Sequence, residues 1–207
     1  MSFHLSALGT ATPPDPLTQD DAVGLARVLG GGVLRDAPWL PAVYAHSGID
    51  TRYQVVGGGL VKDVLAGTRD SGSVFLPTGE EGDPGPTTGQ RMRLYAEEAP
   101  PLALRAAAPA LAASGFAANE ITHLVLVSCT GFAAPGVDLA LIRGLGLRPT
   151  VERTHVGFMG CHGALNGLRV ANAFASADPA ARVLVAAVEL CSLHYYYGSE
   201  ADKLIAN

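Results

Sequence analysis

The sequence predicts an α/β protein built on a parallel β-sheet, and the evidence for it lies in the second half of the chain. Apolar runs of strand length occur at 123–129, 150–158 and 181–190. Helical patterns at 137–147 and 162–177 separate these runs. Strands that alternate with helices of about 10 to 16 residues are typical of right-handed βαβ units, in which helices cover both faces of the sheet. We therefore expect a βαβαβ arrangement.

The first part of the chain gives weaker signals. Residues 3–8 are apolar and form a candidate strand. Thr18 is expected to cap a helix over 19–29, which the GGG at 30–32 ends. Residues 67–90 are rich in Gly, Pro, Ser and Thr, which predicts a long surface loop, either a plain connection or a functional lid.

A long helix is expected from Thr88 to Gly115. Three prolines interrupt this pattern, the pair Pro100–Pro101 and Pro109. Proline lacks a backbone N–H and clashes with the preceding turn. We therefore expect the helix to be kinked or broken at the proline pair and stressed again at Pro109.

Composition and charge exclude several classes of protein. The 207 residues suit one domain or one and a half, and 48% hydrophobic residues allow a sizeable core. A net charge of −5 argues against a general nucleic-acid partner. No apolar stretch approaches the roughly 20 residues of a membrane span, and the N-terminus lacks signal-peptide features. Three cysteines without a CxxC pair suggest a reducing compartment and no zinc site, so we expect a cytoplasmic protein.

The stretch GFMGCHGALNGL, residues 157–168, places Cys161 where a strand gives way to a helix. Free N–H groups and the positive end of the dipole at a helix N-terminus favour thiolate over thiol. The same N–H groups can bind the oxyanion that forms when the sulfur is acylated. A small buried cysteine at a tight turn is an equally good interpretation of these residues alone.

A cysteine nucleophile usually needs a histidine base within hydrogen-bonding reach. His162 is adjacent to Cys161, but neighbours on a helix point about 100° apart. His155 lies on the strand before Cys161 and can point to either face. His123 and His194 lie at strand ends, and His4 and His46 are far along the sequence. The sequence therefore offers no obvious base.

Three stretches together resemble the chalcone/stilbene synthase family, the type III polyketide synthases. They are GTATPP at 9–14, the segment 121–175 with its CHGALNGLR, and ARVLVAAVELCSLHYYYGS at 181–199. CHGALNGLR and ELCSLH resemble the bacterial branch. The resemblance implies a thiolase-like fold of two βαβαβ halves. Residues 1–207 would form the N-terminal half, with a mostly parallel mixed sheet covered by helices, and the C-terminal half would be absent.

The resemblance also implies a chemistry. Cys161 would take an acyl group from a CoA thioester, malonyl-CoA would be decarboxylated, and the carbanion would attack the Cys161 thioester in a Claisen condensation. Acyl-CoA and malonyl-CoA would be substrates, with no cofactor and no metal. The histidine and asparagine that assist in the family lie in its C-terminal half. We therefore expect this chain to be inactive alone and to act as a homodimer or with a complementary C-terminal half.

Further positions carry over from the resemblance as substrate-binding candidates. Cys129 and Thr130 match residues that line the acyl pocket, and Cys191 and His194 match residues that shape the cavity. Ala134 matches a loop residue that reaches across a dimer, and its small size hints at a long starter. Ordinary packing at a strand end is the alternative for each of them.

The CoA-phosphate site departs from the plant pattern. In WLPAVYAHSGIDTRY only His46 and Arg52 are candidate cations. Arg52 is accordingly either a phosphate ligand or a structural salt-bridge residue.

Two other functions stay open from the sequence. The chain could be a non-catalytic half that acts only by pairing with a partner chain. It could also be related to ketoacyl-carrier-protein synthase III or hydroxymethylglutaryl-CoA synthase, which share the fold and the cysteine turn.

Overall fold

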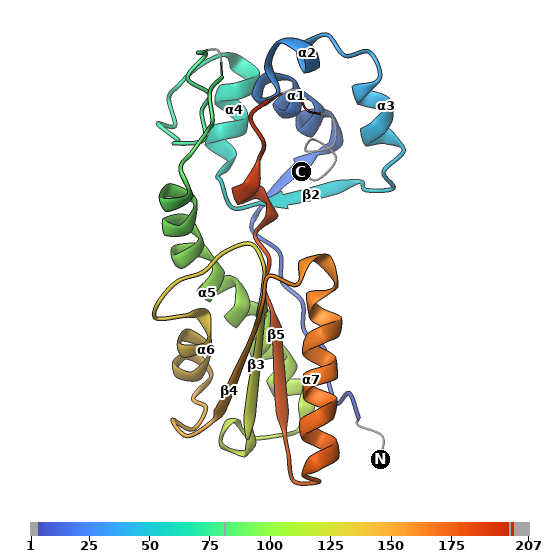
Figure 1. Ribbon diagram of the computed structural model, residues 1–207, viewed down its shortest axis with the longest axis vertical. Coiled ribbons are helices and arrows are strands. Elements are labelled where there is room, and N and C mark those ends of the chain that lie inside the picture. The colour runs from blue at the N-terminus through green and yellow to red at the C-terminus, as the bar shows by residue number, and fades with distance from the viewer. Residues whose placement is uncertain (1–3, 81, 199, 201–207) are drawn as a thin grey trace. The chain divides into compact units, whose positions relative to one another are not determined.

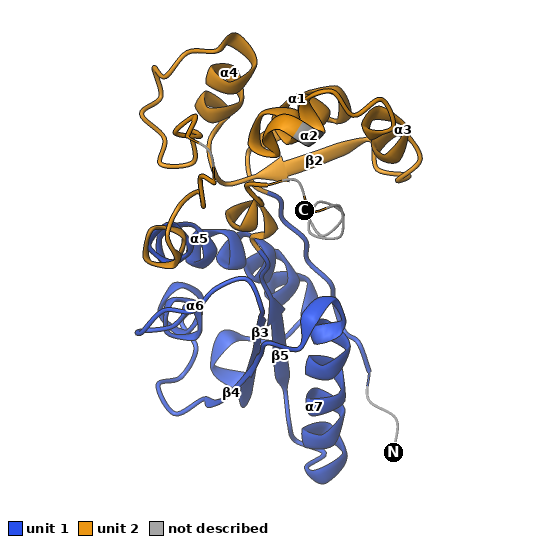
Figure 2. Ribbon diagram, turned by 45° about the horizontal axis from the view of Figure 1, so that its top comes forward, with its two compact units in different colours: residues 1–12, 92–189 blue, residues 13–91, 190–207 orange. Residues whose placement is uncertain are grey.

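The computed structural model describes residues 4–80, 82–198 and 200, and it divides into two compact units (Figure 2). Unit 1 comprises residues 1–12 and 92–189, and unit 2 comprises residues 13–91 and 190–207.

A parallel three-stranded sheet forms the centre of unit 1 (Figure 1). Its strands are β3 (His123–Ser128), β4 (Glu152–Gly157) and β5 (Val183–Ala187), in the order β4-β3-β5. All six residues of β3 are buried, as expected for a central strand that is covered on both faces. The predicted strands are confirmed, and every pairing in this sheet is parallel.

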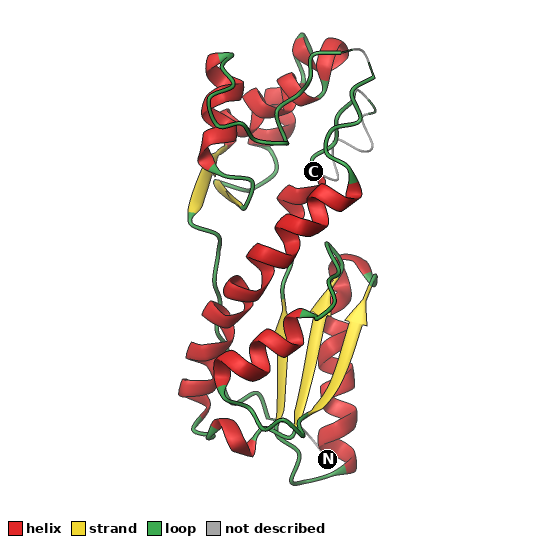
Figure 3. Cartoon of the chain, turned by 90° about the vertical axis from the view of Figure 1, so that its left-hand side faces the viewer, coloured by secondary structure: helices red, strands yellow, loops and turns green. Residues whose placement is uncertain are grey.

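Helices cover the two faces of this sheet (Figures 1 and 3). α6 (Val137–Leu145) connects β3 to β4 and α7 (Gly163–Ala177) connects β4 to β5, so the predicted βαβαβ order is confirmed. α6 ends at Gly146, whose left-handed φ of 69° suits glycine. α7 packs closely on β3, because a Cβ placed on its Gly167 would lie 2.7 Å from Val127 Cγ2.

Of the kink or break predicted at the proline pair, the break is wrong. α5 (Thr88–Ser114) is one continuous helix through Pro100, Pro101 and Pro109, and it ends before Gly115 at φ 78°. Its buried residues include Ala99, Leu102, Ala103 and Ala107, which lie beside the prolines. Tertiary packing of this face offsets the hydrogen bonds that the prolines remove.

The prediction of a strand at 3–8 is also wrong for the described residues, because residues 4–8 pair with no strand. The segment lies against α5 instead. A Cβ on Gly9 would come within 2.1 Å of the Ala106 carbonyl oxygen, and Arg105 Nη2 donates to the Thr12 carbonyl at 2.7 Å. The α5 helix therefore fixes the path of this segment.

In the described part of unit 2, a short antiparallel pair of strands is accompanied by the helices α1 to α4. β1 (Asp15–Thr18) pairs with β2 (Thr51–Gln54), with Asp15 opposite Gln54. The helices are α1 (Gln19–Leu29), α2 (Gly31–Arg35), α3 (Leu40–Ala45) and α4 (Gly58–Ala66). Thr18 caps α1 as predicted, since its hydroxyl accepts the Asp21 N–H at 3.1 Å. The antiparallel pair was not predicted.

The loop that follows α4 is organised by a carboxylate. Asp63 is 3% exposed and accepts hydrogen bonds from the hydroxyls of Thr68 and Ser71 and from the N–H groups of Asp70 and Ser71. The predicted loop is confirmed as far as Thr87, after which α5 begins. In the part of the chain that the structure describes, no helix is both long enough and apolar enough to span a membrane.

Candidate active site

Cys161 lies in a short 3-10 turn, η2 (Gly160–His162), between β4 and α7. Its thiol is free and the residue is exposed. The 15-residue α7 begins two residues later, at Gly163. The strand-to-helix placement that the sequence predicts for Cys161 is thus present, and the residue is not buried as the packing interpretation requires.

The backbone before Cys161 makes a sharp turn. Phe158 has a φ of 58° and Gly160 a φ of 73°, both in the left-handed region. A bulky side chain rarely adopts this region, and such residues gather at functional sites. The Phe158 side chain is 77% exposed, so its own packing does not account for the conformation.

Cys129 lies at the turn that carries Cys161. Its Sγ accepts the Met159 N–H at 3.1 Å and lies 3.7 Å from the Gly160 carbonyl oxygen. A Cβ on Gly163 would lie 3.7 Å from the same sulfur. The structure therefore brings Cys129, at the end of β3, next to the turn at the end of β4.

Glu189 is a site residue that the sequence analysis missed. It follows β5, and its carboxylate accepts the N–H groups of Cys129 at 2.8 Å and Thr130 at 3.0 Å and the Thr130 hydroxyl at 2.7 Å. The sequence feature that could have indicated Glu189 is a single acidic residue directly after an apolar strand. Because parallel strands end at one edge, this position meets the end of β3.

A buried tyrosine of α5 is hydrogen-bonded to the last residue of β3. Tyr95 of α5 is 2% exposed and donates from its hydroxyl to Ser128 Oγ at 2.7 Å. Burial raises the pKa of the Tyr95 phenol, against the lowering effect of the Ser128 hydrogen bond, so the phenol stays protonated and keeps its donor role. A Cβ on Gly131 would come within 2.1 Å of the Tyr95 ring, which requires glycine there.

The loop between β3 and α6 holds Ala134, which is exposed and precedes a cis peptide bond to Pro135. Phe132 in the same loop is 57% exposed, and Met159 before Cys161 is 43% exposed. Together with Phe158 they give the carboxyl edge of the sheet an apolar surface. An exposed group of this kind is typical of a binding site or an interface.

No hydrogen bond in the described part of unit 1 identifies a base for Cys161. His123 is buried at the other end of β3, where it stacks on Phe174 with 4.3 Å between ring centroids and contacts Thr122 Oγ1 at 2.7 Å. Among the residues that the structure describes, no hydrogen bond joins Cys161 to His4, His123, His155 or His162.

Cys191 and His194 lie in unit 2, at the two ends of the 3-10 turn η3 (Cys191–His194). Arg91 holds this turn through its Nη1, which donates to the carbonyl oxygens of Leu193 and Tyr195. The structure brings Cys191 together with Arg52, because both line one small cavity of about 80 Å³.

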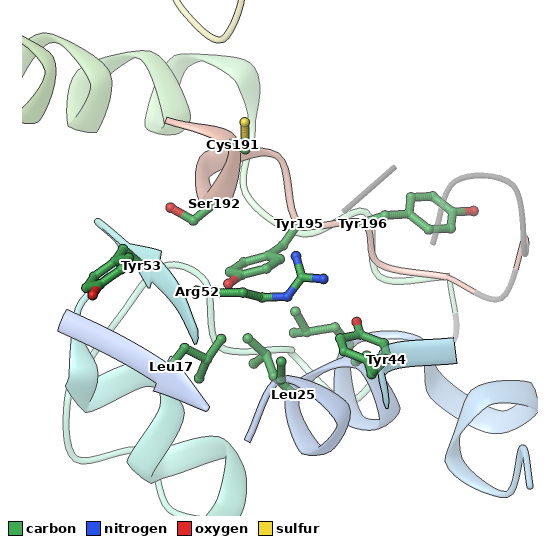
Figure 4. A pocket seen from close by; sticks show the side chains of 12 residues that line it. Leu17, Leu25, Tyr44, Arg52, Tyr53, Cys191, Ser192, Tyr195 and Tyr196 are labelled. Atoms are coloured by element: carbon green, nitrogen blue, oxygen red, sulfur yellow. The ribbon is translucent and has the colours of Figure 1, made fainter. Parts of the chain in front are cut away.

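Arg52 lies inside unit 2 with structural partners. Its Nε donates to Gln19 Oε1 at 3.0 Å, and its Cζ lies 5.3 Å from the centroid of the Tyr44 ring. Figure 4 shows the Arg52 guanidinium between Tyr44 and Tyr195, with the Cys191 thiol directed away from it. Burial raises the pKa of Tyr195 to about 12, although Arg52 acts in the opposite direction. These contacts give Arg52 structural partners in unit 2, and its role as a phosphate ligand stays a prediction.

The fold and this cysteine turn together define a thiolase-like α/β protein. The chain belongs to the chalcone and stilbene synthase family, since residues 78–205 match the N-terminal domain of these enzymes. It is 36% identical over 202 residues to the alpha-pyrone synthesis polyketide synthase-like protein Pks18 of Mycobacterium tuberculosis, a match that covers 97% of this chain and 47% of that protein. It is 34% identical over 184 residues to type III polyketide synthase 10 of Oryza sativa, covering 88% of this chain and 42% of that protein.

Solved structures give the same family. The type III polyketide synthase domain of Steely1 from Dictyostelium matches with a TM-score of 0.78 and 28% identity, over 98% of this chain and 52% of that one. PKS-I from the brown alga Ectocarpus siliculosus matches with a TM-score of 0.76 and 32% identity, over 97% and 51%. The predicted family and thiolase-like fold are confirmed. The chain spans about half the length of the relatives it matches.

Proposed function

We propose that this chain supplies the acyl-accepting cysteine of a type III polyketide synthase. The position of Cys161 carries the proposal: an exposed thiol in a strained turn between a parallel strand and the 15-residue helix α7. Because the chain belongs to this family, acyl transfer is the reaction that we expect at Cys161.

In the proposed first step, the Cys161 thiolate attacks the carbonyl carbon of an acyl-CoA. The carbonyl oxygen becomes an oxyanion, and CoA leaves as its thiolate when the carbonyl re-forms. Malonyl-CoA then loses CO₂, the carbanion attacks the Cys161 thioester, and the cysteine thiolate departs. Backbone N–H groups at the start of α7 are the donors available to the oxyanion.

The other site residues take supporting roles in this proposal. Cys129 and Thr130 line the acyl chain's path beside the nucleophile, and Glu189 fixes the loop that carries them. Ala134 in unit 1 and Cys191 and His194 in unit 2 are the further substrate-binding candidates that the family resemblance gives. Acyl-CoA and malonyl-CoA are the substrates, without a cofactor, and the protein works in the cytoplasm as a homodimer.

The proposal is tested by acyl transfer from a long-chain acyl-CoA such as lauroyl-CoA. The 207-residue chain is incubated with it, alone and after co-expression with the rest of a family member, and peptides are examined by mass spectrometry. We expect a lauroyl thioester on the peptide that contains Cys161, and none in Cys161→Ala. Glu97→Gln, at an exposed position of α5, is the control and should still be acylated at Cys161.

Two results would contradict the proposal. One is acylation of Cys129 or Cys191 with Cys161 unmodified. The other is polyketide formation by the co-expressed Cys161→Ala variant.

A second candidate is a half-protein that functions only when paired, and one observation favours it. No histidine of unit 1 is bonded to Cys161 in the described residues, while the chain spans about half of its relatives. We infer that the base comes from the remaining half of the family's length and that this chain alone does not turn over. Measurable malonyl-CoA decarboxylation by the chain alone would contradict this inference.

A further inference from the structure

We propose that Cys129 is the resolving cysteine of Cys161: when a peroxide oxidises the Cys161 thiol, the Cys129 thiol closes a reversible disulfide with it. This redox modification site lies in unit 1, and the class of molecule that reacts there is a peroxide. Formation of the disulfide depends on the geometry of the two thiols and not on acyl transfer. Its consequence, a reversible block of the nucleophile, rests on the proposed function.

The sulfur of Cys129 lies against the backbone of the turn that holds Cys161. It accepts the Met159 N–H at 3.1 Å and lies 3.7 Å from the carbonyl oxygen of Gly160, the residue directly before Cys161. A Cβ on Gly163 would lie 3.7 Å from the same sulfur. Cys129 Sγ is therefore close to the turn on both sides of Cys161.

These contacts limit the separation of the two cysteines. In a trans peptide unit the carbonyl oxygen lies about 2.8 Å from the next Cα. Since Cys129 Sγ is 3.7 Å from the Gly160 oxygen, it lies within about 6.5 Å of the Cys161 Cα. A disulfide joins Cα atoms that are about 4.4 to 6.8 Å apart. The observed separation is thus of the size that a disulfide needs.

The turn has the freedom to complete this approach. Cys161 is exposed, so rotation of its side chain towards Cys129 sacrifices little packing. Gly160, with a φ of 73°, precedes Cys161, and Gly163 follows two residues later. Glycine backbone is conformationally permissive. Rotation of the Cys161 side chain, together with a movement of this turn, brings the two sulfurs to bonding distance.

Hydrogen bonds hold Cys129 in its position beside the turn. Its N–H donates to the Glu189 carboxylate at 2.8 Å, and the Met159 N–H donates to its sulfur. The third cysteine, Cys191, belongs to unit 2. Cys129 is therefore the cysteine that the structure places next to Cys161.

The exposure of the two thiols assigns their roles. Cys161 is exposed, whereas Cys129 is half-buried. Peroxides react with accessible thiolates, and redox-sensing cysteines commonly lie beside a second, resolving cysteine. Cys161 is thus the thiol that the peroxide reaches, and Cys129 is the thiol that reacts with the oxidised product.

The first step oxidises Cys161. Its thiolate sulfur attacks one oxygen of hydrogen peroxide, the O–O bond breaks, and the hydroxide that leaves takes up a proton to become water. The product is the sulfenic acid of Cys161. The sulfur has lost two electrons, and the peroxide has gained them.

The second step closes the disulfide. The Cys129 thiolate attacks the sulfenic sulfur, the S–S bond forms as the S–O bond breaks, and hydroxide leaves and is protonated to a second water. In sum, two thiols and one peroxide give one disulfide and two waters. Without Cys129, a second peroxide converts the sulfenic acid to the sulfinic acid, which thiols do not reduce. The disulfide therefore keeps the nucleophile recoverable.

Mass spectrometry of tryptic peptides tests the pairing, because trypsin places the three cysteines on separate peptides, 106–143, 154–169 and 183–203. The 207-residue chain is treated with increasing hydrogen peroxide, free thiols are blocked with iodoacetamide, and the digest is analysed without reduction. We expect peptide 106–143 linked to peptide 154–169, and both thiols restored by dithiothreitol. Met159 shares a peptide with Cys161, so fragment spectra are needed to separate its sulfoxide from the products of Cys161.

Cys129→Ser and Cys129→Ala remove the resolving thiol. In both variants the sulfinic acid of Cys161, a gain of about 32 Da on peptide 154–169, should exceed that of the wild type by about tenfold at the same peroxide dose. Cys191→Ser is the matched control and should still link peptides 106–143 and 154–169. Circular dichroism checks that the three variants keep the wild-type fold.

Acylation by lauroyl-CoA gives a separate readout. The oxidised wild type should lose acylation of Cys161 and regain it after dithiothreitol. Oxidised Cys129→Ser should not regain it, because its sulfinic acid resists the thiol.

Three results would overturn the proposal. They are equal sulfinic acid on Cys161 in the wild type and both Cys129 variants, a link from Cys161 to Cys191 in place of Cys129, and a link to Cys129 that occurs only in covalent dimers on a non-reducing gel. If the disulfide forms but the reduced protein is never acylated, the proposed function fails and this inference stands. Acylation without any disulfide would have the opposite meaning.

Discussion

At the scale of single residues, the candidate site depends on the thiol of Cys161 and also on the hydrogen bonds that fix the segment after β3. The Glu189 carboxylate accepts hydrogen bonds from the Cys129 N–H and from the N–H and hydroxyl of Thr130, and Cys129 Sγ in turn accepts the Met159 N–H. This chain of contacts runs from the end of β5 through the end of β3 to the turn before Cys161. A change in Glu189 is therefore expected to reach Cys161 through the backbone.

Glu189→Gln should lower the free energy of unfolding by about 1 kcal/mol. The amide NH₂ of glutamine is a donor, so it cannot accept the hydrogen bonds that one carboxylate oxygen of Glu189 accepts. For a chain of this size the melting temperature should fall by about 2 to 4 °C. Thermal unfolding followed by circular dichroism measures this. Glu97→Gln, on an exposed position of α5, is the control and should leave the melting temperature unchanged. Equal melting temperatures for the two variants would show that the Glu189 contacts carry no stability.

Asp63 predicts a pH dependence of stability in unit 2. Hydrogen bonds from Ser71 and Thr68 lower the pKa of the Asp63 carboxyl below its ordinary value. Since the folded pKa lies below that of the unfolded chain, about 3.9, this stabilisation is complete above about pH 4 and is lost as pH falls towards the folded pKa.

Asp63→Asn should therefore lower the melting temperature at pH 7 and flatten its dependence on pH below about 4. Denaturation at a series of pH values measures both effects. Asp70→Asn, at an exposed position of the same loop, should keep the wild-type dependence. If the melting temperature of Asp63→Asn falls with pH as steeply as that of the wild type, the Asp63 carboxyl is not the cause of the pH dependence.

At the scale of elements, the fit of α7 on the sheet sets the position of the cysteine turn. Gly163 and Gly167 occupy the contact with β3, and a Cβ on either would lie within about 3 Å of Val127. These glycines let the helix approach the strand closely, and the helix start then lies at the end of β4, where Cys161 is.

Gly167→Ala should destabilise the protein by about 1 to 2 kcal/mol, because overpacking outweighs the helix propensity that alanine gains. Chemical denaturation with urea measures the change. Gly89→Ala is the control, since its Cβ would meet only Thr87 Oγ1 at 4.0 Å. It should be neutral or slightly stabilising. If both substitutions behave alike, the close contact between α7 and β3 does not limit stability.

At the scale of the whole molecule, the chain builds two units that are discontinuous in sequence. Unit 1 contains the first residues together with 92–189, and unit 2 contains 13–91 with the last residues. Each has its own buried residues, such as Leu124 and Leu141 in unit 1 and Leu25 and Leu40 in unit 2. Cys161 belongs to unit 1, whereas Arg52, Cys191 and His194 belong to unit 2.

Separate cores predict separate local stabilities. Gly167→Ala should speed amide exchange in β3, α7 and β5 more than in α1 and α4. Asp63→Asn should do the reverse. Hydrogen exchange with mass spectrometry measures both patterns. Uniform acceleration over all elements in both variants would mean that the units unfold as one.

The strands and the cysteine turn of unit 1 could be predicted from the sequence because nearby residues determine each of them. The runs at 123–129, 150–158 and 181–190 contain the observed strands, and the glycine-flanked Cys161 marked the turn before α7. The helix cap at Thr18 depends on one hydroxyl and was equally readable. Long-range partners were not readable. The contact of Glu189 with Cys129 spans 60 positions in sequence.

The sequence by itself therefore determined the βαβαβ order, the family resemblance and the choice of Cys161, because strand and helix periods and short motifs are local properties. Only the tertiary structure decided that α5 continues through three prolines, that residues 4–8 form no strand and that Arg52 is tied to Gln19 and Tyr44. It also showed a cavity of about 620 Å³ beside β5. These features depend on which distant segments pack together, and burial against a distant segment can override the preference of a local stretch.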